Sequence, residues 1–135
     1  MYNNILVAIA LDHSVNTAPA FKIARTLASD GASITALHVI EDVPAYAIAY
    51  LPREHHETRR AEAEAGLRAE LGGVTDVKPV VVNGPAGTCI VDYAEKHGMD
   101  CIVIASHRPG LQDYFLGSTA GRVVRHARCA VHVLR

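Results

Sequence analysis

Short runs of apolar, mostly β-branched residues recur along the chain and predict five strands. The first run spans residues 5–10 and ends at a polar turn. The other predicted strands span 33–40, 77–82, 101–105 and 130–134. Apolar runs of this length with few polar interruptions are typical of strands that are covered on both faces of a parallel sheet.

Between these runs, apolar residues follow a helical spacing. In the first such segment Ala20, Ile23, Ala24 and Leu27 recur at i, i+3, i+4 and i+7, and Gly31 is the expected stop. Further helices are expected over 54–71, 88–97 and 118–127. Strands that alternate with helices form βαβ units, whose right-handed crossovers produce a parallel sheet with helices on both faces.

The sequence therefore predicts a single α/β domain over residues 1–135, a length suited to one domain. The fold class is a doubly wound, five-stranded parallel sheet in the order 3-2-1-4-5. Such sheets bind ligands outside the carboxyl ends of the strands, where the strand order reverses. Here that point lies between the first and fourth strands, where the loops 11–14 and 106–117 meet.

Composition narrows the classes of partner. Thirteen Lys and Arg stand against fourteen Asp and Glu, so a net charge of -1 gives no electrostatic case for nucleic acid or an acidic membrane. No apolar run approaches the roughly 20 residues of a membrane span, and no secretory signal is evident at the start. Cys89, Cys101 and Cys129 are odd in number, form no C-x-x-C pair and lie in apolar stretches, which indicates a reduced, cytoplasmic compartment.

Gly117, Ser118 and Thr119 are candidates for holding a phosphate, because they stand where a strand and loop lead into a helix. A helix start offers free N–H donors and the positive end of a dipole. Gly117 permits close approach of the backbone, and the two hydroxyls can hydrogen-bond phosphate oxygens. The alternative is that Ser118 is only an N-cap and Gly117 only a turn glycine.

The segment 104–119, followed by 122–127 and 131–135, resembles the C-terminal signature of the universal stress protein family. The start of the chain, 1–7, and the strand segment Leu37–Ile40 resemble that family as well. The resemblance implies the fold predicted above, dimerisation, and membership of either a nucleotide-binding or a non-binding group.

The nucleotide-binding group has a sequence motif in which two residues separate the first two glycines, and nine further residues precede a third glycine followed by Ser or Thr. Gly117 and Ser118 match the last pair, Ala105 stands at the first glycine, and Arg108 or Pro109 replaces the second in a loop one residue shorter. The shorter Ser-x-x-Pro form resembles the bacterial F and G type branch, some of whose members hold ATP. A guanidinium at Arg108 can itself pair with phosphate oxygens.

By this resemblance the ligand is ATP or AMP, with Mg²⁺ as a possible companion. The family aspartate that meets the ribose is replaced by Ala10, so Asp12 is the candidate, with a turn or capping role as the alternative. The backbone of Val39 would read the adenine, or Val39 is ordinary sheet core. The predicted binding set is Ala8, Asp12, Val39, Ala105, Ser106, His107, Arg108, Gly117, Ser118 and Thr119.

Other chemistry is less well supported. His107 either contacts phosphate or braces the loop, and bracing is slightly favoured. His55 and His56 lie side by side in a helix start, where adjacent residues cannot all face one metal ion. No catalytic base or nucleophile is evident, so any ATP hydrolysis or self-phosphorylation at Ser118 or Thr119 would be slow. The P-loop, G-x-S-x-G and phosphoacceptor patterns are absent from the sequence.

Two functions are compatible with these residues. The first is a stress-response protein that binds an adenine nucleotide, and the second is a non-nucleotide interaction or scaffold module of the same fold. In both, the apolar edge strand 130–134 needs a cover, and the resemblance implies a homodimer or a higher oligomer through it.

Overall fold

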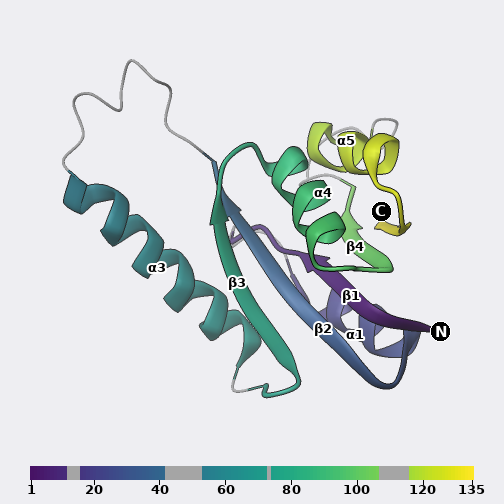
Figure 1. Ribbon diagram of the computed structural model, residues 1–135. Coiled ribbons are helices and arrows are strands. Elements are labelled where there is room, and N and C mark those ends of the chain that lie inside the picture. The colour runs from purple at the N-terminus through teal and green to yellow at the C-terminus, as the bar shows by residue number, and fades with distance from the viewer. Residues whose placement is uncertain (12–15, 42–52, 73, 107–115) are drawn as a thin grey trace.

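The computed structural model describes residues 1–11, 16–41, 53–72, 74–106 and 116–135 (Figure 1). Its strands form one parallel sheet in the order β3-β2-β1-β4-β5, which confirms the predicted fold class and strand order. The strands are β1 (Tyr2–Ala8), β2 (Ala28–Ile40), β3 (Val77–Asn83), β4 (Cys101–Ala105) and β5 (Ala130–Leu134).

Helices cover both faces of this sheet. One apolar cluster joins it to α1 (Ala18–Leu27) and α3 (Arg53–Leu71). A second cluster on the opposite face joins it to α4 (Ala86–Lys96) and α5 (Ser118–His126). Figure 1 shows α4 and α5 side by side, across the sheet from α1.

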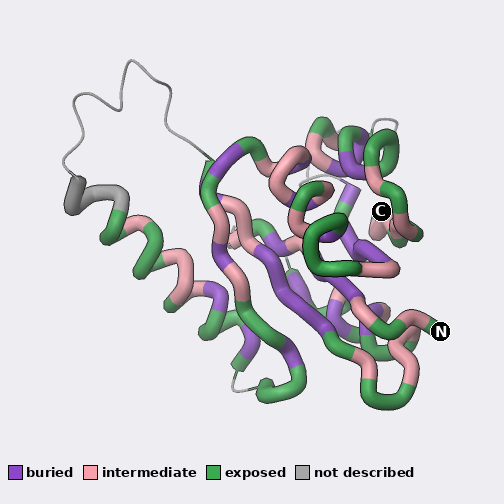
Figure 2. The backbone as a smooth tube through the Cα atoms, viewed as in Figure 1, coloured by how far each residue is buried: buried purple, intermediate pink, exposed green. Residues whose placement is uncertain are grey.

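The apolar runs arise from this double cover. Ile5 and Val7 belong to the cluster with α1 and α3, whereas Leu6 between them belongs to the cluster with α4 and α5, and all three are fully buried. Successive side chains of a strand point to opposite faces, so a strand covered on both faces needs an apolar residue at every position. Figure 2 shows this burial along the central strands, while α3 stays exposed over much of its length.

The predicted boundaries of the first helix and of the first two strands were wrong. The helix ends at Leu27 and β2 follows at once from Ala28, whereas the sequence predicted a helix stop at Gly31 and a strand from residue 33. Gly31 lies within β2 with φ 76°, where pairing with β1 shifts register. A glycine with positive φ serves a helix end and a strand irregularity equally well. β1 also ends at Ala8, earlier than predicted.

The two edges of the sheet differ in their protection. Along β3, Pro79 has no N–H to offer, and Nη2 of Arg60 on α3 donates to the Val81 carbonyl at 3.2 Å. β5 pairs with β4 and contains neither proline nor a charged residue. Unpaired edge groups are a template for another strand, and proline and charge are common ways of blocking them.

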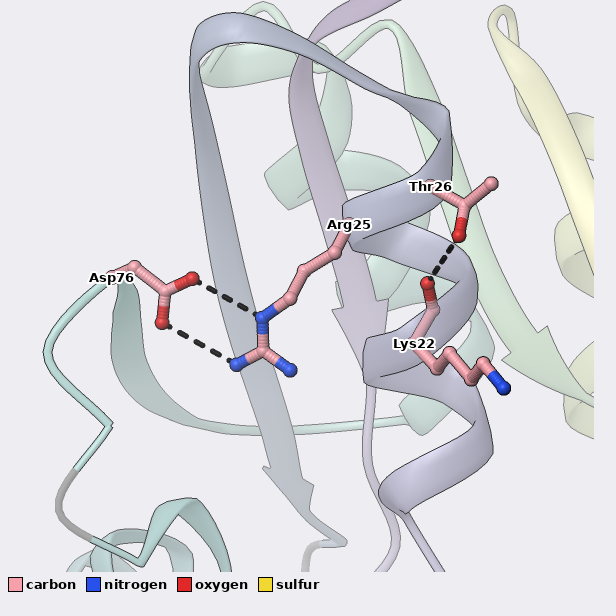
Figure 3. A network of polar contacts seen from close by, with 4 residues as sticks. All are labelled: Lys22, Arg25, Thr26 and Asp76. Atoms are coloured by element: carbon pink, nitrogen blue, oxygen red, sulfur yellow. Dashed lines mark hydrogen bonds and ion pairs between the residues drawn. The ribbon is translucent and has the colours of Figure 1, made fainter.

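An ion pair links α1 to the turn before β3 (Figure 3). Arg25 donates from Nε and Nη2 to the two carboxylate oxygens of Asp76, at 3.2 and 3.3 Å. The hydrogen bond from Arg25 holds the pKa of Asp76 below its usual range, so the pair stabilises the fold at neutral pH and is lost as pH falls through that lowered pKa. Both side chains are about half exposed, and solvent screening keeps such a pair weak.

Gly84, which follows β3, generates a stability prediction. Its φ is 141°, and an added Cβ would lie 2.6 Å from Sγ of Cys89. We expect Gly84→Ala to lower the free energy of unfolding by about 1–3 kcal/mol in urea titrations, from backbone strain together with the clash. Gly98→Ala is the matched control, because Gly98 has φ 64° but no atom within 4 Å of an added Cβ.

The clash is tested separately in a Cys89→Ala background, which removes the sulfur. There Gly84→Ala should cost less than in the wild-type chain. An equal cost in both backgrounds would show that strain alone acts at this position.

Candidate functional site

The ends of β4 and the start of α5 are held together at the carboxyl edge of the sheet. The N–H of Gly117 donates to the Ser106 carbonyl at 2.6 Å, and the N–H of Ser106 donates to the Leu134 carbonyl at 2.7 Å. Ser106 is buried, with 2% of its surface exposed. These two bonds fix both ends of the segment between Ser106 and Gly117 against β5, so the sequence-predicted loop begins and ends at one place.

Gly117 occupies the N-cap position of α5, with φ −56° and ψ 155°. Its carbonyl accepts the N–H of Gly121 at 2.7 Å. Ser118 is therefore the first residue of the helix and not its cap, and it is exposed, while Thr119 is half-buried. A glycine cap supplies no side-chain oxygen for the first-turn N–H groups, which suits a ligand that brings its own acceptor.

His38 ties the exit of β1 to β2. Its Nδ1 lies 2.9 Å from the Ile9 carbonyl, and the N–H of Ile9 donates to the Leu37 carbonyl at 2.9 Å. A carbonyl only accepts, so Nδ1 carries the proton in this bond. Both polar groups of Ile9 are thus engaged by β2, and this fixes the direction in which the chain leaves toward Ala10, which is exposed.

The end of β2 also lies on this edge. Val39 is half-buried, packs against the cluster that contains α4 and α5, and pairs with Val82 of β3. Its side chain is therefore part of the sheet packing, as one of the two interpretations expected. Ala8 at the end of β1 is half-buried against the same cluster.

The described members of the predicted binding set all come from one edge of the sheet. Parallel strands present their carboxyl ends together, so topology brings these residues to the same side. The predicted positions that the structure describes are Ala8, Val39, Ala105, Ser106, Gly117, Ser118 and Thr119. Asp12, His107 and Arg108 lie outside the described residues, and their roles stay predictions.

Sequence reasoning did not single out His38 or Arg122 for this edge. The signal for His38 was present, since it is a histidine inside the otherwise apolar end of the strand. For Arg122 there was no local signal, because its distinguishing contact is with Gly87 on another helix.

Cys101 and Cys129 are poor candidates for catalysis. Burial raises the pKa of the Cys101 thiol to about 11, with the nearby Cys129 and Asp100 adding to the effect. Burial also raises the pKa of the Cys129 thiol. The reactive form of cysteine is the thiolate, and the raised pKa disfavours that form at both positions.

Within the described residues, no group of three or more His, Cys, Asp or Glu side chains is placed to hold a metal ion. In the same part of the chain, no helix has both the length and the apolar character needed to cross a bilayer.

Comparison with known sequences gives matches over the whole chain. The family model described as Universal stress protein family matches residues 1–135. Universal stress protein A homolog 2 of Coxiella burnetii is 30% identical over 140 residues, covering 99% of this chain and 95% of that protein. Universal stress protein G of Escherichia coli O157:H7 is 30% identical over 142 residues, covering the full length of both.

Solved structures share the fold. The protein MJ0577 aligns with a TM-score of 0.81 and 26% identity over 99% of this chain and 96% of that one. A universal stress protein solved in complex with cAMP aligns with a TM-score of 0.61, 22% identity and coverage of 99% and 97%. The universal stress protein of Archaeoglobus fulgidus, solved in complex with dAMP, aligns with a TM-score of 0.64, 16% identity and coverage of 99% and 98%.

The bond between His38 and Ile9 yields a test of how this edge is held. His38→Leu should lower the free energy of unfolding by about 1–3 kcal/mol, because the Ile9 carbonyl loses its side-chain donor. His38→Asn should recover part of that loss, since its amide N–H₂ lies near the position of Nδ1. Urea unfolding of the three proteins measures both effects, and equal losses in the two variants would contradict the hydrogen-bond argument.

Proposed function

We propose, since the chain belongs to the universal stress protein family, that it is a stress-response protein that binds ATP or AMP at the carboxyl ends of β1 and β4. The family was predicted from the segment 104–119, and the match over residues 1–135 confirms it. The observation that carries the proposal is the 2.6 Å bond from Gly117 to Ser106, which closes the predicted phosphate loop at the start of α5. Two proteins of the same fold, solved with cAMP and dAMP, support it.

The phosphates are proposed to lie on the first turn of α5. The N–H groups there meet the positive end of the helix dipole, and Gly117 has no Cβ to obstruct an approaching phosphate. The hydroxyls of Ser118 and Thr119 can add hydrogen bonds. His107 and Arg108 are proposed to complete the phosphate contacts, and Mg²⁺ would accompany the phosphates of ATP.

The base and ribose are proposed to lie along β1 and β2. The backbone of Val39 would bond the adenine edge, which is compatible with the packed state of its side chain. Asp12 would meet the ribose, and Ala8 would line the floor. The bond between His38 and Ile9 supports this arrangement, because it fixes where the chain departs toward Asp12.

Replacement of a family glycine by Ala105 is compatible with this proposal. Ala105 is the last residue of β4, and no described residue other than glycine has positive φ. A glycine is therefore not required at this position by the backbone conformation. The remaining cost is the space taken by one exposed methyl group.

Catalysis is not part of the main proposal. At most the protein hydrolyses ATP slowly or phosphorylates itself at Ser118 or Thr119. We further propose that it acts as a single domain over residues 1–135 in the cytoplasm, where its three cysteines stay reduced.

A second candidate function is a non-nucleotide dimeric interaction module. The observation that favours it is Ala10, which stands exposed where the family commonly has an aspartate. A purified sample without nucleotide absorbance and without a thermal shift in ATP would support this alternative.

A homodimer through β5 is proposed in either case. The Leu134 carbonyl accepts the N–H of Ser106, which follows β4, so the backbone groups of Val131 and Val133 face the open side. Unlike β3, which has Pro79, this edge strand contains no proline. Two copies related by a two-fold axis would pair these edges and extend the sheet.

Nucleotide binding is tested by calorimetric titration with ATP and AMP. The wild-type chain should bind saturably, and Gly117→Val should weaken binding by about tenfold or more, the effect of losing roughly 1.4 kcal/mol. Valine tolerates the φ and ψ of Gly117, so its side chain acts mainly by occupying the phosphate position. Unchanged thermal stability of the variant is the control for folding.

Absence of saturable binding by the wild-type chain up to millimolar nucleotide would end this proposal. Equal affinities of the wild type and Gly117→Val would instead show that the phosphates do not bind at the start of α5.

The dimer is tested by placing a proline in β5, the residue type that blocks the edge of β3. Val131→Pro removes an N–H from the open edge and leaves the ladder to β4 intact, so it should convert a dimer to a monomer in light scattering. Val131→Ala is the matched control, because it shortens the side chain but keeps the N–H. A wild-type monomer, or a Val131→Pro dimer, would exclude this interface.

A further inference from the structure

The packing between α4 and α5 fixes the stem of one arginine. Gly87 is buried in the first turn of α4, and a Cβ added to it would lie 2.8 Å from Cδ and 3.1 Å from Cβ of Arg122. The 2.8 Å separation is shorter than real Cβ contacts and the 3.1 Å separation is unusually tight, so a larger residue at this position would displace the stem from this turn. Arg122 is thus exposed yet held between two helices, whose N-terminal halves lie next to each other in Figure 1.

Arg122 differs from the nearby Arg125 and Arg128 in the contacts of its guanidinium group. Nε of Arg125 donates to the Gly121 carbonyl at 3.2 Å, and Nη1 of Arg128 lies 3.3 Å from the Glu95 carboxylate. Arg122 makes no hydrogen bond or ion pair with any residue in the described ranges. Residues 116–135 contain no Asp or Glu at all, so this segment supplies no counter-charge of its own.

The guanidinium charge of Arg122 adds to two other positive features at this place in the protein. It lies against the first turn of α4 and one turn into α5, where both helix dipoles are positive. An anion bound there would reverse the sign of this interaction. Ser118, four residues before Arg122, lies on the same face of α5, roughly 6 Å away along the helix axis.

We infer that Arg122 is a phosphate-binding residue that selects ATP over AMP, an inference that rests on the proposed nucleotide site. The first turn of α5 holds one phosphate, and the guanidinium of Arg122 pairs with another through its two-pronged set of donors. Side chains of a helix lean toward its N-terminus, which lets Arg122 reach back toward Ser118. AMP, with a single phosphate, cannot engage both positions.

The experiment compares ATP and AMP affinities by calorimetry in the full chain. Arg122→Gln should weaken ATP binding by about tenfold, the range of a lost charge-assisted contact, and leave AMP binding nearly unchanged. Arg128→Gln is the matched control, since it removes the same charge from the same segment at a residue paired with Glu95, and it should alter neither affinity. Arg122→Lys should recover part of the ATP affinity.

Gly87→Ala is a second variant that keeps the charge and displaces the stem, and it should also weaken ATP more than AMP. Thermal melts of each variant establish that it is folded. Equal loss of ATP and AMP affinity in Arg122→Gln, or no loss, would overturn the role of Arg122 while nucleotide binding itself stands. A wild-type chain that binds neither nucleotide would overturn the proposed function and this inference together.

Discussion

Burial of β1 on both of its faces is the constraint on which the rest of the structure depends. Ile5, Leu6 and Val7 have no exposed surface, and they divide between two clusters on opposite sides of the sheet. A strand buried in this way must have neighbours on both edges and helices on both faces. The pairing of β1 with β2 and β4 satisfies the edges, and it places beside β1 the point at which the strand order changes direction. The site is a consequence of that reversal.

The sequence predicted much of this fold because its signals were local. The spans 101–105 and 130–134 coincide with β4 and β5, since each is a bounded apolar run. Gly31 was misread because a positive φ at a glycine ends a helix in one context and bends a strand in another. Only the register against β1 separates the two, and that register joins residues distant in sequence.

The sequence predicted the candidate site as an edge of the sheet and a loop, and it gave less information about the contacts there. Topology located Ser106 and Gly117 together, and their hydrogen bond agrees with it. The bond from His38 to Ile9 crosses between strands, and the contact of Arg122 with Gly87 crosses between helices. Contacts of this kind depend on how elements pack, and periodicity within one element holds no information about them.

The difference in protection between the edge strands β3 and β5 bears on how many copies of the chain could associate. Pro79 and the bond from Arg60 to Val81 obstruct strand addition at β3, which leaves β5 as the edge for the proposed dimer. When only one edge of a sheet can accept a partner, two copies that pair through it leave no open edge, and the assembly is closed. A sheet with two receptive edges would instead add copies without limit. If the proposed dimer forms through β5, the obstruction at β3 would keep that assembly closed and prevent filaments, from the opposite edge of the sheet.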